Sequence, residues 1–225
     1  EERISAARDN EPTMLSFAQE RMWFLDQLQD VTGAFNSPLE AQFSGPLNVE
    51  ALKKSVDEVL RRHEVLRTTF RLVAGKPAPS VCPPKSGCME LIDCSTMGIA
   101  ERNRFIDERR LADSSSPFDL ATGPLVRITL LRCEPETHLL LLTTHHIVSD
   151  GWSVGIFLQE LASLYEAFNA GRPTPLPEPE IQYSDYARWQ RKQLVDDKLE
   201  RDLSYWRHAL KGAPAQLALP TDKAR

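Results

Sequence analysis

Two adjacent histidines and a nearby carboxylate are the groups in this chain whose types and spacing could do chemistry. His145, His146 and Asp150 lie in one short run, HHIVSDG, at residues 145–151. An imidazole titrates near neutral pH, so it can accept a proton or hold an attacking group by a hydrogen bond. The run is therefore the first candidate for a functional site.

The residue types alone allow three interpretations of this run. The histidines could be core residues with satisfied hydrogen bonds, capped by a turn aspartate. His146 and Asp150 could share a metal ion, although the chain has no HExxH or CxxC segment and no third ligand at a useful spacing. Ser149 or Ser153 could be the nucleophile of a hydrolase. Because the chain has only five histidines in 225 residues, two adjacent ones at a strand end favour a functional role.

The elements on either side of the run would place it on a turn between a strand and a helix. Residues 138–144, HLLLLTT, form a nearly unbroken apolar run, which predicts a strand buried in the middle of a sheet. Because consecutive strand residues point to opposite sides, His145 and His146 cannot face the same cavity. We therefore expect one histidine to be chemical and the other structural. Beyond Gly151, apolar residues recur at helical spacing: Val154, Phe157, Leu158, Leu161, Leu164, Tyr165 and Phe168.

The rest of the chain predicts an α/β fold, with a central mixed sheet flanked by helices. Patterning predicts helices at 14–29, 48–62 and 99–111, and strands at 39–44, 65–73 and 125–132, the last forming a hairpin with 138–144. Residues 75–84 suit an exposed hairpin or loop. Residues 171–180 have proline at every second position, which excludes helix and predicts a stiff extended connector. Residues 181–209 then resume as one or two helices.

Four segments, in order, resemble the motifs of one family. They are SFAQERMWFL at 16–25, RHEVLRTTF at 62–70, HHIVSDGWS at 145–153 and YSDYARWQR at 183–191. Together they resemble the condensation domain of nonribosomal peptide synthetases. A lone H-x-x-x-D motif is less specific, because chloramphenicol acetyltransferase and other CoA-dependent acyltransferases carry related motifs.

The resemblance implies a chloramphenicol-acetyltransferase-like lobe. Together with the charged, patternless first residues and the proline-rich segment, it predicts a division of the chain. Residues 1–12 would be a mobile leader, 13–170 the N-terminal lobe of a condensation domain, 171–180 a connector, and 181–225 the incomplete start of a second lobe. In this family the catalytic channel runs between two similar lobes. We therefore expect this half alone to lack activity.

The resemblance also implies a reaction and a set of site residues. The family joins a donor acyl or peptidyl thioester to the amine of an acceptor aminoacyl thioester. His146 would act on the amine, with His145, Asp150 and Gly151 completing the motif. Independently of the resemblance, a carboxylate that follows a buried strand needs a cation or several hydrogen-bond donors, so we expect Asp150 to be structural. Arg62 and Arg67 are the candidate cations, although either could be surface charge. Gly151 would leave room for the substrate.

The same resemblance implies that the domain binds no cofactor and works with other domains. Its substrates would be carried on the phosphopantetheine of donor and acceptor peptidyl carrier domains, next to an adenylation domain and the C-terminal lobe. The residues Gly151, Trp152 and Ser153 are more similar to those of family members that accept an L-configured donor.

Two alternatives stay open, a CoA-dependent acyltransferase and a non-catalytic docking module. Docking modules often have altered His-His motifs, whereas the motif is intact here.

Composition limits the classes of partner. The 27 Lys and Arg against 32 Asp and Glu give a net charge of −5 with no basic run, so nothing indicates nucleic-acid or anionic-membrane binding. No apolar run is long enough to span a membrane and no signal-peptide pattern is present, which predicts a cytoplasmic protein. Cys82, Cys88, Cys94 and Cys133 fit no metal spacing, and we expect reduced thiols.

Overall fold

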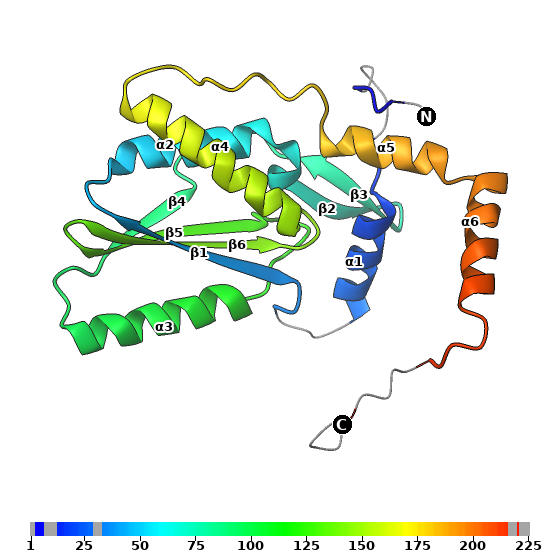
Figure 1. Cartoon of the computed structure of the whole chain (residues 1–225), viewed down its shortest axis with the longest axis horizontal. Coiled ribbons are helices and arrows are strands. Elements are labelled where there is room, and N and C mark those ends of the chain that lie inside the picture. The colour runs from blue at the N-terminus through cyan, green and yellow to red at the C-terminus, as the bar shows by residue number, and fades with distance from the viewer. Residues whose placement is uncertain (1–2, 7–12, 29–32, 216–219, 221–225) are drawn as a thin grey trace.

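A computed structural model describes residues 3–6, 13–28, 33–215 and 220 (Figure 1). Helices and strands are interspersed along the chain, and they form a sheet with helices packed on it. Their order is α1 (Phe17–Leu28), β1 (Asn36–Ser44), α2 (Val49–Arg62), the 3₁₀ helix η1 (Glu64–Arg67), β2 (Thr68–Val73), β3 (Lys76–Val81), β4 (Met89–Asp93), α3 (Ile99–Ser115), β5 (Val126–Glu134), β6 (Thr137–His145), α4 (Gly151–Asn169), α5 (Tyr183–Gln193) and α6 (Asp196–Ala209).

The main sheet has four strands in the order β1-β6-β5-β4. β6 pairs antiparallel with both β1 and β5, and β4 pairs parallel with β5. Strands β2 and β3 form a separate antiparallel hairpin. The predicted mixed sheet flanked by helices is confirmed, because α2 and α4 lie on one side of the main sheet and α3 lies on the other (Figure 1).

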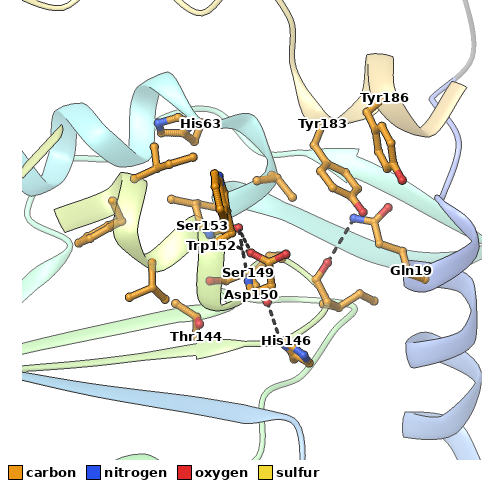
Figure 2. A pocket seen from close by; sticks show the side chains of 18 of the residues that line it. Gln19, His63, Thr144, His146, Ser149, Asp150, Trp152, Ser153, Tyr183 and Tyr186 are labelled. Atoms are coloured by element: carbon orange, nitrogen blue, oxygen red, sulfur yellow. Dashed lines mark hydrogen bonds between the residues drawn. The ribbon is translucent and has the colours of Figure 1, made fainter. Parts of the chain in front are cut away.

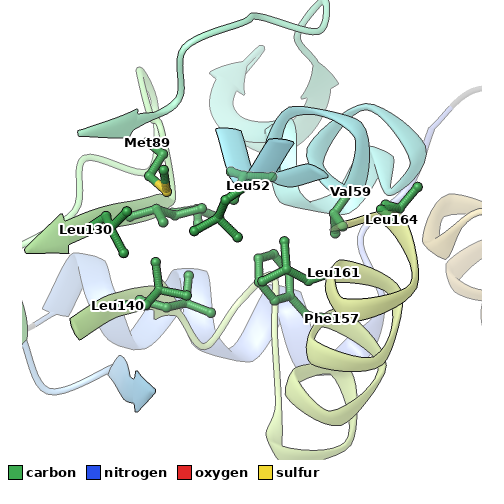
Figure 3. Close-up of a cluster of buried hydrophobic side chains, with 12 residues drawn as sticks. Leu52, Val59, Met89, Leu130, Leu140, Phe157, Leu161 and Leu164 are labelled. Atoms are coloured by element: carbon green, nitrogen blue, oxygen red, sulfur yellow. The ribbon is translucent and has the colours of Figure 1, made fainter. Parts of the chain in front are cut away.

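Strand β6 is the most buried element of the sheet, since every residue from His138 to His145 is buried. Its even-numbered leucines, Leu140 and Leu142, join a cluster with side chains of α2 and α4 (Figure 3). Its odd-numbered leucines, Leu139 and Leu141, pack with Ile106 of α3. Burial of each such side chain contributes about 1.5–3 kcal/mol. Coverage on both faces therefore explains the unbroken apolar run and fixes the end of β6 in the core.

The local sequence of α2 determines where this helix begins and ends and which face it buries. Asn48 caps its start, because the Asn48 side chain accepts a hydrogen bond from the Ala51 N–H at 3.1 Å. Leu52, Val56 and Val59 recur at helical spacing and face the sheet. The helix ends at Arg62, where the sequence prediction also ended it.

Several predicted boundaries were wrong. The helix expected from residue 14 begins at Phe17, and the strand expected to end at residue 132 ends at Glu134. The strand expected from residue 65 begins at Thr68, because residues 64–67 form a 3₁₀ turn that the Thr68 hydroxyl stabilises by donating to the Glu64 carbonyl. Strand β1 starts at Asn36 and includes Pro38, which an edge strand tolerates because no other strand among the described residues pairs with its outer N–H groups. Helix α3 continues to Ser115. The segment 75–84 does form a hairpin strand despite Pro77 and Pro79.

The proline-rich connector, residues 171–180, contains neither helix nor strand, as predicted. It is held against the end of α2. The Arg62 guanidinium donates to the carbonyl oxygens of Leu176 and Pro177, and Arg61 pairs with Glu178. The connector therefore follows a fixed path over the surface before α5 begins.

The residues after the connector form two helices, within the range predicted. Helix α5 attaches to α1, because the Arg191 guanidinium donates to the Leu15 carbonyl and the Phe17 N–H donates to the Gln190 amide oxygen. Helix α6 extends away from the rest of the chain (Figure 1). Of the predicted leader, 1–12, only residues 3–6 are described, and the others lie outside the described residues, as do 216–219 and 221–225.

The four cysteines are free, which agrees with the expected reduced thiols. Within the described part of the chain, no helix has the length and apolar character needed to cross a bilayer.

Candidate active site

The turn between β6 and α4 presents the two histidines to opposite sides, as strand alternation predicts. β6 ends at His145 and α4 begins at Gly151. His146 is exposed and lines a pocket, whereas His145 is buried with 3% of its surface exposed. Of these two imidazoles, only that of His146 is therefore available to a ligand.

The tautomer of His146 is set by its own loop. Its Nδ1 lies 2.8 Å from the Ser149 carbonyl oxygen (Figure 2). A carbonyl only accepts hydrogen bonds, so Nδ1 must carry the proton and donate. In the neutral imidazole the lone pair is then on Nε2, the nitrogen that remains for a ligand. The loop thus presents one basic nitrogen in a fixed orientation.

His145 has the opposite tautomer and a structural environment. Its Nδ1 accepts a hydrogen bond from the Ile147 N–H at 3.1 Å, so in the neutral ring the proton is on Nε2. Its ring also packs against Phe35 and Phe118, with centroids 5.8 and 6.1 Å away. Burial, with a smaller contribution from neighbouring His146, lowers the pKa of His145 to about 4. His145 is therefore neutral in the folded protein at physiological pH.

We expect this burial to make stability fall with acid. The unfolded His145 has a pKa of about 6.5. Its pKa is lower in the folded state, so its contribution is complete above pH 6.5 and is lost as the pH falls toward 4. Urea unfolding across this range should show the loss. His145→Asn offers a non-titrating acceptor for the Ile147 N–H and should flatten this part of the pH profile, although its overall stability should be lower. An unchanged profile would contradict the assignment.

Asp150 caps helix α4. Its carboxylate accepts hydrogen bonds from the Ser153 N–H at 2.8 Å and from the Ser153 hydroxyl, and the Asp150 N–H reaches the Ser153 hydroxyl at 3.4 Å. This reciprocal pair is a capping box. The hydrogen bonds from Ser153 hold the pKa of Asp150 below its usual value. Asp150 is exposed, so its carboxylate needs no buried cation.

The prediction that Arg62 or Arg67 neutralises Asp150 is wrong. The Arg62 guanidinium is buried and pairs with Glu160 at 3.1 Å, in addition to its two connector carbonyls. The Arg67 guanidinium donates to the Cys82 carbonyl and pairs with Glu64. Both arginines bind chain segments around α2, and the cap already satisfies Asp150.

This correction changes the expected cost of mutating Asp150. Asp150→Ala removes a helix cap and should lower the free energy of unfolding by about 1 kcal/mol. A broken buried ion pair would cost more, about 3–5 kcal/mol. Asp150→Asn keeps an acceptor oxygen at the cap and should be nearly neutral. Urea unfolding at pH 7 distinguishes these values, and a loss near 4 kcal/mol for both variants would restore the buried-pair interpretation.

Ser153 does not have the geometry of a hydrolase nucleophile. The segment GWSVG, 151–155, matches the G-x-S-x-G spacing by sequence. In a hydrolase the serine sits on the sharp turn before the helix, paired with a histidine. Here Ser153 is inside the first turn of α4, and its hydroxyl donates to Asp150. The hydrolase interpretation is therefore not supported.

His146 opens onto a pocket of about 800 Å³ (Figure 2). Its walls come from α1, η1, β6, α4 and α5 and from the loop between β6 and α4, so the pocket brings together segments far apart in the sequence. Its lining includes Gln19 and Met22 from α1, His63 beyond α2, Leu142 and Thr144 from β6, Trp152, Ile156 and Phe157 from α4, and Tyr183 and Tyr186 from α5. Most of these groups are apolar or aromatic.

Gln19 and Tyr183 belong to the first and fourth sequence motifs, which gave them no role. The buried Gln19 amide donates to the Ile147 carbonyl at 3.3 Å and accepts from the Ser16 N–H at 3.2 Å. Ser16 in turn is hydrogen-bonded to the Tyr183 hydroxyl at 3.0 Å. Burial raises the pKa of Tyr183, which keeps this phenol protonated. The network ties the histidine loop to α1 and α5.

Gly151 has no steric need to be glycine within this chain. A Cβ built there would meet no atom within 4 Å. The open space lies beside the first turn of α4, next to exposed Trp152. Among the described residues, no cluster of three or more His, Cys, Asp or Glu side chains is arranged to hold a metal ion.

The fold and the site together define a chloramphenicol-acetyltransferase-like lobe that presents one histidine at the end of a buried strand. A family model for the condensation domain matches residues 10–225. Because this match covers nearly the whole chain, the chain belongs to the condensation-domain family. In nonribosomal peptide synthetases this family forms amide bonds, in concert with carrier and adenylation domains.

Three similar relatives are much longer proteins. Malpinin synthetase of Mortierella alpina is 44% identical over 97% of this chain and 3% of that protein. Chondramide synthase cmdD of Chondromyces crocatus is 43% identical over 94% of this chain and 5% of that protein. Phosphinothricin tripeptide synthetase PhsC of Streptomyces viridochromogenes is 40% identical over 96% of this chain and 20% of that protein. The chain thus spans a small part of each relative.

Solved structures show the same fold. The X-domain from teicoplanin biosynthesis has a TM-score of 0.85 and 26% identity, over 100% of this chain and 49% of that chain. The first condensation domain of the CDA synthetase has a TM-score of 0.79 and 24% identity, over 95% of this chain and 53% of that chain. The chain spans about half the length of these structures.

Proposed function

We propose that this chain supplies the histidine-bearing half of a site that joins two carrier-bound substrates. The acceptor amine attacks the carbonyl carbon of the donor acyl or peptidyl thioester. A C–N bond forms, the C–S bond breaks, and the electron pair leaves on the donor thiolate. The amine loses one proton and the thiolate gains one, so the reaction needs no oxidant or reductant.

The observation that carries this proposal is the fixed tautomer of His146. Its Nδ1–H donates to the Ser149 carbonyl, which leaves the Nε2 lone pair for a ligand in the pocket. That nitrogen can accept the amine proton or orient the amine by a hydrogen bond. Tethering both substrates beside it would supply a large part of the rate by proximity.

The proposed partners follow from the reaction. Donor and acceptor peptidyl carrier domains would bring their phosphopantetheine arms to the pocket, and the domain would bind no cofactor of its own. The adjacent adenylation domain would load the acceptor carrier. Within this scheme residues 171–180 would connect the N-terminal lobe, 13–170, to the start of the second lobe, 181–225.

A docking module is the second candidate function. It is favoured by the high TM-score to the X-domain from teicoplanin biosynthesis, which has also been solved as a complex with OxyB. Against it stands His146, which is intact, exposed and oriented in the pocket. A docking surface needs no basic nitrogen at that place.

One experiment tests the proposal directly. The full-length protein is mixed with one carrier loaded as a donor thioester and a second loaded with an aminoacyl group. Intact-mass spectrometry of the acceptor carrier should show the added donor acyl mass, with loss of that mass from the donor carrier. Stable binding of a partner without any transfer, over a panel of donor and acceptor pairs, would favour the docking module instead.

A further inference from the structure

Thr144 is a polar side chain in an apolar row. On β6 the residues facing α2 and α4 are Leu140, Leu142 and then Thr144, and the first two belong to the main apolar cluster. Thr144 pairs across the sheet with Val126, which belongs to the same cluster. Only 3% of Thr144 is exposed. Packing alone would favour an apolar residue at this position.

The Thr144 hydroxyl has no hydrogen-bond partner among the described residues. A buried hydroxyl without a partner destabilises the fold, because its hydrogen bonds to water are lost on folding. The similarly buried Thr68 shows the usual solution, since its hydroxyl donates to the Glu64 carbonyl at 2.7 Å. The missing partner of Thr144 therefore needs an explanation.

The position of Thr144 supplies one. Thr144 lies near the end of β6, lines the same pocket as His146 and precedes it by two residues (Figure 2). Since even fully extended backbone advances only about 3.4 Å a residue, their Cα atoms are at most about 7 Å apart. Leu142 and Phe157 line the pocket beside Thr144. A substrate chain that extends from the reacting atoms at His146 toward this apolar region would pass the Thr144 hydroxyl.

We propose that Thr144 is a specificity-determining residue, whose hydroxyl binds a hydrogen-bonding group on the aminoacyl or acyl chain of a carrier-bound thioester. This inference rests on the proposed condensation function and names the substrate class that the site selects. The pocket would prefer a chain that is mostly apolar with one polar atom near the reacting centre. A chain without that atom would leave the hydroxyl unpaired in the complex and bind less well.

Two substitutions and a matched control test the proposal in the full-length protein. Thr144→Val replaces the hydroxyl by a methyl group of nearly the same shape, whereas Thr144→Ser keeps the hydroxyl. Thr143→Val makes the same change one residue earlier, on the face of β6 that packs toward α3. The assay compares two acceptor pairs of similar shape, threonyl with valyl and asparaginyl with leucyl, and the matching donor pairs, all as carrier-bound thioesters.

The proposal predicts opposite changes in stability and in selectivity. Thr144→Val should raise the melting temperature by about 2–4 °C, because it removes an unpaired buried hydroxyl. In the same variant, the ratio of the rate with the polar member to the rate with the apolar member should fall about tenfold for at least one pair. Thr144→Ser should retain the preference, and Thr143→Val should leave it unchanged.

Two results would overturn the proposal. If Thr144→Val keeps the preference for the polar member of each pair within twofold of the wild type, the hydroxyl binds no substrate group. A lower melting temperature in that variant would show a structural role.

If the wild type forms no amide with any pair, the condensation function fails instead. Thr144 is then tested by thermal shift, in which the polar thioesters should stabilise the wild type more than Thr144→Val, and equal shifts would reject it.

Discussion

His146→Ala should lower the rate of amide formation by about 10²–10⁴-fold, the usual contribution of a positioned acid or base. The Nε2 lone pair of His146 is the basic nitrogen that the loop between β6 and α4 fixes in the pocket. The fold should survive, because His146 is exposed and belongs to none of the apolar clusters. Intact-mass detection of the acyl-carrying acceptor, together with urea unfolding, measures both effects.

A second substitution separates proton transfer from positioning. The amide oxygen of His146→Gln can accept a hydrogen bond from the amine but cannot take its proton at neutral pH. Activity of His146→Gln well above that of His146→Ala would assign His146 to positioning, whereas equal loss in both would favour a base. His145→Ala is the matched control on the opposite side, and its main effect should be on stability. Near wild-type rates in His146→Ala would remove the imidazole from the mechanism.

The sequence was informative where one physical constraint dominates. The run from His138 to Thr144 predicted a buried strand because only a strand covered on both faces needs apolar residues at every position. Strand alternation then separated His145 from His146 before any contact was known. The family motifs added the reaction, which the residue pattern alone left open among several interpretations.

The contacts of the site were less predictable. The buried strand before Asp150 suggested a buried carboxylate with an arginine partner. Whether a carboxylate is buried or capped depends on how the helix begins, and Ser153 completes the cap here. Gln19 and Tyr183 reach the histidine loop only because α1 and α5 pack together, a long-range arrangement that spacing along the chain does not encode. Thr144 looked like an ordinary strand residue until its hydroxyl proved to have no partner among the described side chains.

A protein made only of these 225 residues should fold without joining substrates. The chain corresponds to about half of the solved condensation domain, and the pocket at His146 is open to solvent. Helix α6 carries apolar residues at helical spacing, Leu199, Leu203 and Trp206, with Leu210 just after it, and all four are exposed. An incomplete channel would not align two substrates, so the proximity contribution, about 10⁵-fold or more, would be lost.

The exposed face of α6 gives this prediction a second readout. Uncovered apolar surface favours self-association, so light scattering after gel filtration should show species larger than a monomer. Leu203→Glu with Trp206→Glu should restore a monomer, because both residues are exposed and neither lines the pocket. Neither form should transfer an acyl group between carriers, whereas a protein that also contains the other half of the domain should. Efficient transfer by the monomeric 225-residue form would contradict the prediction, because residues within this chain would then suffice to align both substrates at His146.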